Sequence, residues 1–417
     1  MNKYINYFKN SEKRTACRRL GAEVEHLILK PDYTWVDYPT VERILERMAE
    51  KGWERHYTDG RLLGLDLDGM HITLEPGSQF ELSLDPKATI EQLEESYKTA
   101  MRDAVEAIEG EGLKIYALAY QPFTKKDDIL IIPKKRYEYM NEYFKDKGRL
   151  AHNMMRASAS CQFAVDYESE EEFVMIYQTI NRIGPYLSLI FDNTPYVEGS
   201  LYEDHLFRTT IWQNCDDQRC GLLNNGLEET FGYETYADHI LNFEPILGMK
   251  DGVAYPTYTK KTKEVVATPY DRADWEHYLS MGFFDVRAKS YLEIRMIDSV
   301  PYPYNFAAVA LLKGIIYSEA LGSLAEELKD VDREELLEKT RLIMKEGYDA
   351  PGVRAFNQRL LCLAHQGLPE DERHYLDPIR PMIEKGYSFK DHLLQLEAEE
   401  GIDGMMKEVE VTLEKLS

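Results

Sequence analysis

Apolar residues recur at helical spacing in several segments of the chain. They follow this spacing over 40–52, which ends at Gly52, and over 89–112, where Thr89 and Gln92 form a typical capping pair. We predict further helices over 3–18 and 169–191, and in a strongly apolar segment that starts near 306. Most later segments keep the helical pattern, so we predict that the chain is mostly helical from about 306 onward.

Alternating apolar and polar residues predict strands over 22–30, 61–84, 113–120 and 290–298. Within 61–84, Asp68-Gly69 predicts a short turn between two strands, and Pro76-Gly77 predicts a bend in the second strand. Residues 150–167 are expected to lead, as helix or loop, into another strand. No repeat or linker divides the sequence. We therefore predict one α+β domain over 1–417, with a mainly antiparallel sheet covered by helices.

Composition excludes several classes of protein. The chain has 74 acidic and 50 basic residues and a formal charge of −24, so we expect neither nucleic acid nor an anionic membrane as a partner. Its five cysteines have no spacing typical of a disulfide framework or a zinc site. No apolar run reaches the length of a signal peptide or a membrane span. A cytoplasmic location is the resulting expectation.

Acidic side chains interrupt the predicted strands in a regular way. Glu23 and Glu25 are two residues apart, so they share one face of their strand. Gln79 and Glu81 also share a face, and Glu75 has the same parity beyond the predicted bend. The first pair alone fits a solvent-facing strand as well as a functional site. The repetition on a second strand favours a sheet face lined by carboxylates.

A third strand has the same pattern, with Tyr291, Glu293 and Arg295 on one side. Carboxylates gathered on one face repel one another unless cations lie among them. Mg²⁺ binds carboxylate and phosphate oxygens, and arginines such as Arg136 and Arg208 can bind phosphate or carboxylate, although surface salt bridges are an alternative for each. The sequence has no glycine-rich phosphate loop. A bound nucleotide would therefore depend on metals and arginines.

Five segments resemble, in the same order, the glutamate–cysteine ligases of the plant and proteobacterial type. They are GAEVE, ITLEPGSQFELS, IIPKKRYEYM, RTTIW and YLEIRMID, and the similarity extends from about residue 20 to 320. The resemblance implies a glutamine synthetase-like, carboxylate-amine ligase fold. It also implies ATP-dependent formation of γ-glutamylcysteine from glutamate and cysteine through γ-glutamyl phosphate, the first step of glutathione synthesis.

The resemblance also implies roles for individual residues of this chain. The implied metal ligands, for two or more Mg²⁺ ions or Mn²⁺ in their place, are Glu23, Glu25, Glu75, Glu81, Gln162 and Glu293. The implied catalytic residues are Arg208 and Arg295, which would serve glutamate and the phosphates of the co-substrate ATP. The implied substrate or nucleotide contacts are Gln79, Lys135, Arg136, Tyr137, Trp212 and Tyr291.

Other functions remain open at this point. Ala164 stands where relatives commonly have Asn, and the segment after Arg208 keeps only part of the family pattern, so a different amine could replace cysteine. The reaction could also stop at the acyl phosphate, as in a phosphotransferase. A metal-binding scaffold that retains the fold without catalysis is the non-enzyme alternative. We expect a monomer or homodimer whose partners are small-molecule substrates.

Overall fold

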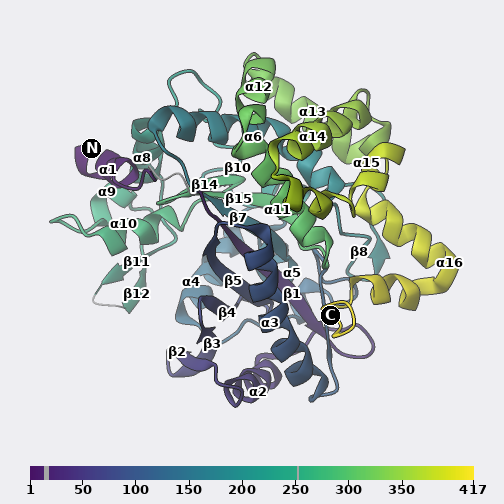
Figure 1. Cartoon of the computed structure of the whole chain (residues 1–417). Helices are drawn as coiled ribbons and strands as arrows, with labels where there is room; N and C mark the ends of the chain where they lie inside the picture. Colours follow the sequence, from purple (N-terminus) through teal and green to yellow (C-terminus); the bar gives the residue numbers. More distant parts are fainter. Residues whose placement is uncertain (14–17, 251–252) are drawn as a thin grey trace.

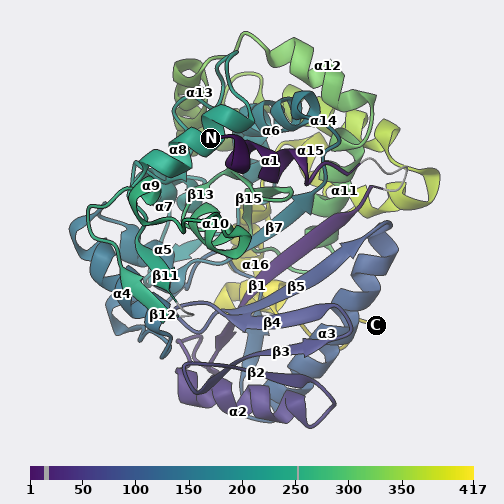
Figure 2. The same cartoon turned by 90° about the vertical axis from the view of Figure 1, so that its left-hand side faces the viewer.

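A computed structural model describes residues 1–13, 18–250 and 253–417. Its described part contains a nine-stranded antiparallel sheet that begins at β14 and continues through β15, β7, β1, β5, β4 and β3 to β2, with β6 paired to β1. Figure 2 shows the strands from β15 to β2 side by side, with α2 beyond β2. The strands are β14 (Val286–Ala288), β15 (Leu292–Asp298), β7 (Ser160–Val165), β1 (Leu20–Leu29), β5 (Phe80–Lys87), β4 (Met70–Leu74), β3 (Arg61–Leu67), β2 (Glu54–Thr58) and β6 (Lys114–Tyr116).

One face of this sheet packs into the hydrophobic core. Val24, Leu82, Phe163 and Ile294 come from four neighbouring strands and are all buried. Three long helices pack on the sheet: α3 (Ile90–Glu109) on β5, α6 (Glu170–Ile190) on β15, and α11 (Tyr304–Ile316) on β1. Because side chains alternate along a strand, the polar residues between these apolar ones lie on the opposite face.

The C-terminal third is helical, as predicted. Helices α11 to α16 lie together on one side of the molecule in Figure 1. The predicted fold class is confirmed: an α+β protein with a large antiparallel sheet and C-terminal helices. After α11, the helices are α12 (Glu319–Leu328), α13 (Arg333–Glu346), α14 (Val353–Gly367), α15 (Arg380–Lys385) and α16 (Phe389–Val409).

Shorter elements complete the fold, and those of the middle of the chain lie in front of the polar face in Figure 2. The remaining helices are α1 (Asn2–Lys9), α2 (Tyr38–Ala49), α4 (Lys135–Tyr143), α5 (Ala151–Ala157), α7 (Phe207–Gln213), α8 (Tyr233–Asn242), α9 (Thr262–Val265) and α10 (Arg272–Leu279). The remaining strands form three small pairs: β8 (Tyr196–Val197) with β9 (Ser200–Leu201), β10 (Cys220–Gly221) with β13 (Phe283–Phe284), and β11 (Leu247–Lys250) with β12 (Val253–Pro256).

The predicted strand pair over 61–84 is in fact three strands. Asp68 and Gly69 both have positive φ and form the predicted turn between β3 and β4. The bend at Pro76-Gly77 is a second turn, closed by a hydrogen bond from the Glu75 amide to the Gln79 carbonyl, at 3.0 Å. It separates β4 from β5, so Glu75 lies on the turn and not on the strand that carries Glu81.

Two helix predictions were too long. The helix predicted over 3–18 ends at Lys9, and the amide of Lys13 donates instead to the carbonyl of Tyr167. Residues 14–17, which include Cys17, lie outside the described part of the chain. The apolar segment after 306 forms two helices with an angle of 78° between them. The second helix, α12, starts separately because the Ser318 side chain caps it by accepting a hydrogen bond from the Ala320 amide.

The strand predicted over 113–120 was also too long. Within 113–120, the residues that pair with β1 are those of β6 (Lys114–Tyr116), and the following amide of Ala117 donates to the carbonyl of Val409 at 2.9 Å. The amide of Val411 likewise donates to the carbonyl of Ile115 in β6, also at 2.9 Å. The segment after α16 is therefore hydrogen-bonded directly to the central sheet.

No single helix in the described residues is long and apolar enough to cross a membrane. Together, α11 and α12 meet the length and composition criteria for a bent span. Most residues of α11 are buried in the core, which accounts for its apolar composition.

Candidate active site

The polar face of the central sheet gathers the acidic residues that the sequence pattern had indicated. Glu25 lies opposite Glu81 where β1 pairs with β5, and Glu23 lies opposite Gln162 where β1 pairs with β7. Glu293 lies opposite Ala164 on the other side of β7. Four adjacent strands thus place these residues on one face, as alternation predicts.

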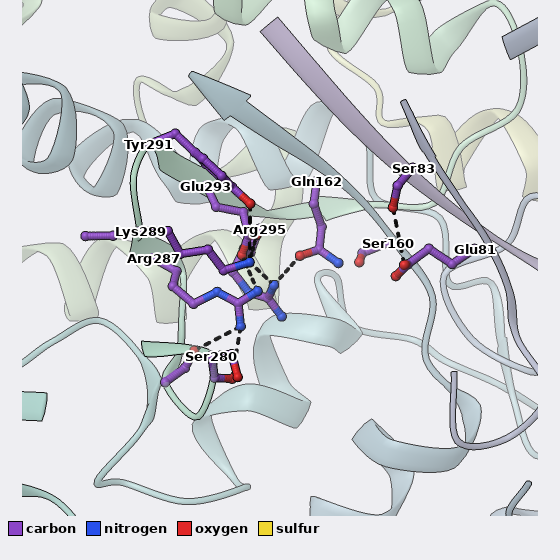
Figure 3. Close-up of polar contacts among 12 residues, drawn as sticks. Glu81, Ser83, Ser160, Gln162, Ser280, Arg287, Lys289, Tyr291, Glu293 and Arg295 are labelled. Carbon is purple, nitrogen blue, oxygen red and sulfur yellow. Dashed lines mark hydrogen bonds and ion pairs between the residues drawn. The ribbon is translucent and has the colours of Figure 1, made fainter. Parts of the chain in front are cut away.

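Glu293 is almost fully buried and is surrounded by cations. Its carboxylate lies 2.5 Å from Arg287 Nη2, 2.9 Å from Lys289 Nζ and 2.8 Å from Arg295 Nη1. Figure 3 shows these side chains converging, with Tyr291 beside them. Burial alone would raise the pKa of Glu293, but Arg287, Lys289 and Arg295 lower it below the ordinary value for a glutamate. Glu293 is therefore ionised and holds the cations together.

Glu25 is held by neutral hydrogen-bond donors. Its carboxylate accepts hydrogen bonds from the Ser160 amide at 2.8 Å, the Ser160 hydroxyl at 3.1 Å and Gln162 Nε2 at 2.9 Å. Gln162 in turn accepts a hydrogen bond from Arg295, which links this carboxylate to the cations around Glu293. Burial, with repulsion from Glu75, raises the pKa of Glu25 to about 7.

Glu23 and Glu81 form no salt bridge within the described residues, although the cations around Glu293 lie near Glu23. Burial, followed by repulsion from Glu23, Glu75 and Glu25, raises the pKa of Glu81 well above its ordinary value. Burial and repulsion from Glu293 likewise raise the pKa of Glu23. Thr73 donates a hydrogen bond to Glu81 at 2.7 Å but brings no charge. This part of the face would be stabilised by an added cation.

The chemistry of these side chains suits a hard divalent cation, because they supply several carboxylate oxygens and the amide oxygen of Gln162. Their present positions do not form a coordination shell. Within residues 1–13, 18–250 and 253–417, no three His, Cys, Asp or Glu side chains are close enough together to hold a metal ion. The donor set and its unbalanced charge fit a metal, while the ligand geometry is not preformed.

Two cavities open on this face. One, of about 150 Å³, is lined by Glu23, Gln162, Tyr291 and Glu293, among others. The second, of about 80 Å³, has Arg295 in its wall together with Glu25, Glu75, Gln79, Arg208 and Trp212. Arg295 thus contacts the carboxylates of the first cavity and lines the second. A larger cavity of about 470 Å³ lies between α6, α7 and α13 and shares only Trp212 with the second cavity.

Some predicted substrate contacts lie elsewhere. Lys135 is exposed and pairs with Glu138 at 2.5 Å, and it lines neither of these two cavities. Arg136 also lines neither; its Nη2 lies 3.4 Å from Ser280 Oγ. Gln79 lines the second cavity, but its side-chain amide is already bonded: it donates to the Ser158 carbonyl and accepts from the backbone amide of Gly77. Tyr137 contacts Glu75, to which its hydroxyl donates at 3.2 Å.

Sequence reasoning missed several members of the site. Arg287 and Lys289 are odd-numbered, like Glu293 and Arg295. Because Arg287 pairs with Glu293 across the β14–β15 turn, continuing the alternation through that turn would have placed both cations on the same face. Ser160 shares the parity of Gln162 on β7. We named Lys135 as a substrate contact from the sequence and did not name Lys134. Lys134 has Glu75 and Glu81 among its charged neighbours.

Comparison with known proteins identifies the family. Residues 19–409 match the model of glutamate-cysteine ligase family 2. Glutamate–cysteine ligase B from the chloroplast of Oryza sativa subsp. japonica is 28% identical over 399 residues, covering 92% of this chain and 79% of the relative. The chloroplastic glutamate–cysteine ligase of Arabidopsis thaliana is 26% identical over 414 residues, covering 94% and 78%.

A solved structure shares the fold at much lower sequence identity. Glutamate–cysteine ligase from Francisella tularensis, solved in complex with AMP, aligns with a TM-score of 0.61 and 8% identity, covering 95% of this chain and 88% of that one. The fold and the match to the family model cover nearly the same residues. The chain belongs to glutamate-cysteine ligase family 2.

Proposed function

We propose that the polar face of the sheet is the active site of an ATP-dependent ligase that joins the γ-carboxylate of glutamate to the amine of cysteine. Glutamate–cysteine ligation, the first step of glutathione synthesis, is the activity of the family to which the chain belongs. One observation supports this site above others: unbalanced carboxylates and a cluster of cations meet on the same sheet face. Transfer of a phosphoryl group to a carboxylate requires both kinds of group.

The phosphates of ATP would lie beside Glu293. Arg287, Lys289 and Arg295 already converge there, and three cations around one carboxylate can also bind a polyanion. Arg295 would stabilise charge on the phosphoryl group as it moves, because it lies between the two cavities. The product of that step is an acyl phosphate, which the amine then attacks to form the amide and release phosphate.

Glutamate would lie in the cavity lined by Arg208. The Nε of Arg208 is buried without a hydrogen-bond partner in the described residues, so this guanidinium retains capacity for a carboxylate. Its other nitrogens bond to backbone carbonyls and to Asp298, which restricts its orientation. Trp212 lines the same cavity and stacks against Phe283, with ring centroids 6.0 Å apart.

We further propose two or more Mg²⁺ ions, or Mn²⁺ in their place, on this face. Glu23, Glu25, Glu75, Glu81, Gln162 and Glu293 would supply the ligands. Bound Mg²⁺ supplies positive charge that neutralises the phosphates and polarises the group being transferred. Burial and neighbouring carboxylates raise the pKa values of Glu25 and Glu81, and bound cations would offset the repulsion between these carboxylates.

The test is an assay with ATP, Mg²⁺, glutamate and a panel of amines, following phosphate release and product mass. We expect cysteine to give the highest rate and a product of the mass of γ-glutamylcysteine. Arg295→Gln should lower that rate by roughly 100-fold or more. Arg272→Gln is the control, because Arg272 is an exposed residue paired with Glu276.

Each competing function has its own outcome in this assay. Faster turnover with another amine would retain the ligase and change the acceptor. If ATP and glutamate release phosphate and no amine accelerates this release, the reaction stops at the acyl phosphate. If no phosphate is released under any condition, the ligase function is wrong and the metal-binding scaffold is favoured. We also propose that residues 1–417 act as one catalytic unit, in the cytoplasm, as a monomer or homodimer.

A further inference from the structure

Arg208 lines the second cavity, yet both of its terminal nitrogens are bonded to the protein. Its side chain is only 4% exposed. Nη1 donates to the Ile297 carbonyl at 3.2 Å and lies 3.4 Å from Asp298 Oδ1, while Nη2 lies 3.4 Å from the Arg295 carbonyl. These contacts all come from β15, the strand that also carries Glu293. The orientation of Arg208 is therefore coupled to that strand.

Asp298 is the anionic partner in this arrangement. It is 4% exposed, and its second oxygen, Oδ2, accepts a hydrogen bond from the Asn193 amide at 2.9 Å. That amide therefore holds the oxygen of Asp298 that is not the one nearest Arg208. Burial raises the pKa of Asp298 to about 7, and Arg208 opposes this rise by favouring the charged form.

A second buried aspartate holds the helix that carries Arg208. Asp192 is fully buried, and its Oδ2 accepts a hydrogen bond from the Leu206 amide at 3.2 Å and lies 3.1 Å from His205 Nδ1. Leu206 is the N-cap residue of α7 and has a positive φ of 56°, which is an uncommon conformation for a leucine. Asp192 thus fixes the start of α7, two residues before Arg208.

A buried lysine of the C-terminal helix α16 lies near both aspartates. Lys390 of α16 is 1% exposed and donates to the Tyr202 carbonyl at 2.6 Å and to the Asp204 carbonyl. Asp192 and Asp298 are both among its charged neighbours. A lysine is rarely buried to this extent without such partners.

From these contacts we infer that Asp298 is a positioning residue for Arg208, and that Asp192 fixes the helix start that places Arg208 in the glutamate cavity. This inference rests on the proposed function, because it concerns the arginine to which we assign glutamate. Neither aspartate lines the cavity, so neither contacts the substrate. They act through the guanidinium and through the backbone of α7.

The experiment compares Asp298→Asn with Asp285→Asn in the full-length protein. Asn keeps the shape of the side chain and its acceptor for the Asn193 amide but removes the charge next to Arg208. Asp285 is the matched control, because Arg208 and Arg295 are among its charged neighbours and no hydrogen bond joins its carboxylate to either. Both variants remove one negative charge near the same arginines, and only one of them removes a direct contact.

We expect Asp298→Asn to raise the KM for glutamate by roughly 10- to 100-fold, because a small misplacement of a binding group has effects of this size. The KM for ATP should change by less than about threefold. Asp285→Asn should leave both constants within about twofold of the wild-type values. The double variant Asp298→Asn with Arg208→Gln should be no worse than Arg208→Gln alone, because coupled residues are not additive.

Equal changes in both KM values, or an additive double variant, would overturn the inference. A midpoint of urea unfolding, measured for every variant, separates misfolding from misplacement. If Asp298→Asn is too unstable to assay, Asp192→Asn is tested by the same criterion. A wild-type protein without glutamate-dependent activity would instead refute the proposed function, which is a different outcome.

Discussion

At the scale of single residues, the two glutamates beside the cation cluster have opposite electrostatic situations. Glu293 is paired with three cations, whereas the pKa of Glu23 is raised by burial and by repulsion from Glu293. The same change, from Glu to Gln, should therefore destabilise the protein at Glu293 but not at Glu23. It should still remove activity at both positions if both residues bind metal.

We expect Glu293→Gln to lower the free energy of unfolding by about 3 to 5 kcal/mol, because it leaves buried cations unpaired. Glu23→Gln should leave the free energy of unfolding of the metal-free protein unchanged or raise it. Both variants should lose roughly 100-fold or more in kcat. Urea unfolding without metal, together with the ligase assay, measures both quantities. Equal destabilisation by the two variants would contradict the charge arrangement described here.

Single residues were also where sequence reasoning was most successful. Strand parity correctly placed Glu23, Glu25, Glu81 and Glu293 on one face, because alternation is a local property of the backbone. Parity applied to β15 alone did not show that Glu293 has three cationic partners, since two of them come from the segment before β15. The pairing of charges depends on tertiary contacts that a sequence pattern does not contain.

At the scale of secondary-structure elements, the turn between β4 and β5 places Glu75 and Gln79 in the second cavity. Gly77 lies at its tip, where an added Cβ would be only 1.9 Å from the carbonyl oxygen of Arg156. A backbone atom cannot move aside as a flexible side chain can. The close approach of this turn to α5 thus requires glycine.

We expect Gly77→Ala to lower the free energy of unfolding by about 1 to 3 kcal/mol through overpacking, and to lower ligase activity by displacing Glu75. Gly322→Ala is the control, because nothing lies within 4 Å of the added Cβ in α12. That substitution should stabilise the protein by up to about 1 kcal/mol through helix propensity. Urea unfolding and the ligase assay measure both effects. A Gly77→Ala protein as stable and active as the wild type would show that the turn has room.

Elements with local signals were predicted well, and those with remote partners were not. The capping box of Thr89 and Gln92 marked the start of α3 because its hydrogen bonds lie within four residues. The ends of α1 and β6 depend on Tyr167 and Val409, which are far away in the sequence. Resemblance implied substrate contacts around Lys135, and in the structure Tyr137 of this segment lies beside Glu75 whereas Lys135 is exposed.

At the scale of the whole molecule, the polar face concentrates part of a large negative charge. The chain has a formal charge of −24, and several of its carboxylates repel one another at this face. Divalent cations should therefore stabilise the folded state, because the unfolded chain separates these groups. Screening by monovalent salt should reproduce only a small part of the effect at buried positions.

We expect Mg²⁺ to raise the free energy of unfolding by about 2.7 kcal/mol when its concentration is 100 times its Kd. Sodium chloride at the same ionic strength is the control. Glu23→Gln should reduce the gain from Mg²⁺, because it removes one proposed ligand. Thermal or urea unfolding with and without metal measures the change. Stabilisation that salt reproduces in full would argue against a specific metal site.

The hydrogen bonds between β6 and the segment after α16 have a consequence for synthesis. Residues 409–411 bond to a strand beside β1, the strand that carries Glu23 and Glu25. A ribosome adds roughly 5 to 20 residues each second. The hydrogen bonds from β6 to residues 409–411 therefore cannot form until the intervening chain has been made. During that interval the edge of β6 is open to other strands. Until residue 411 emerges, a newly made chain therefore lacks the partners that cover this edge of β6.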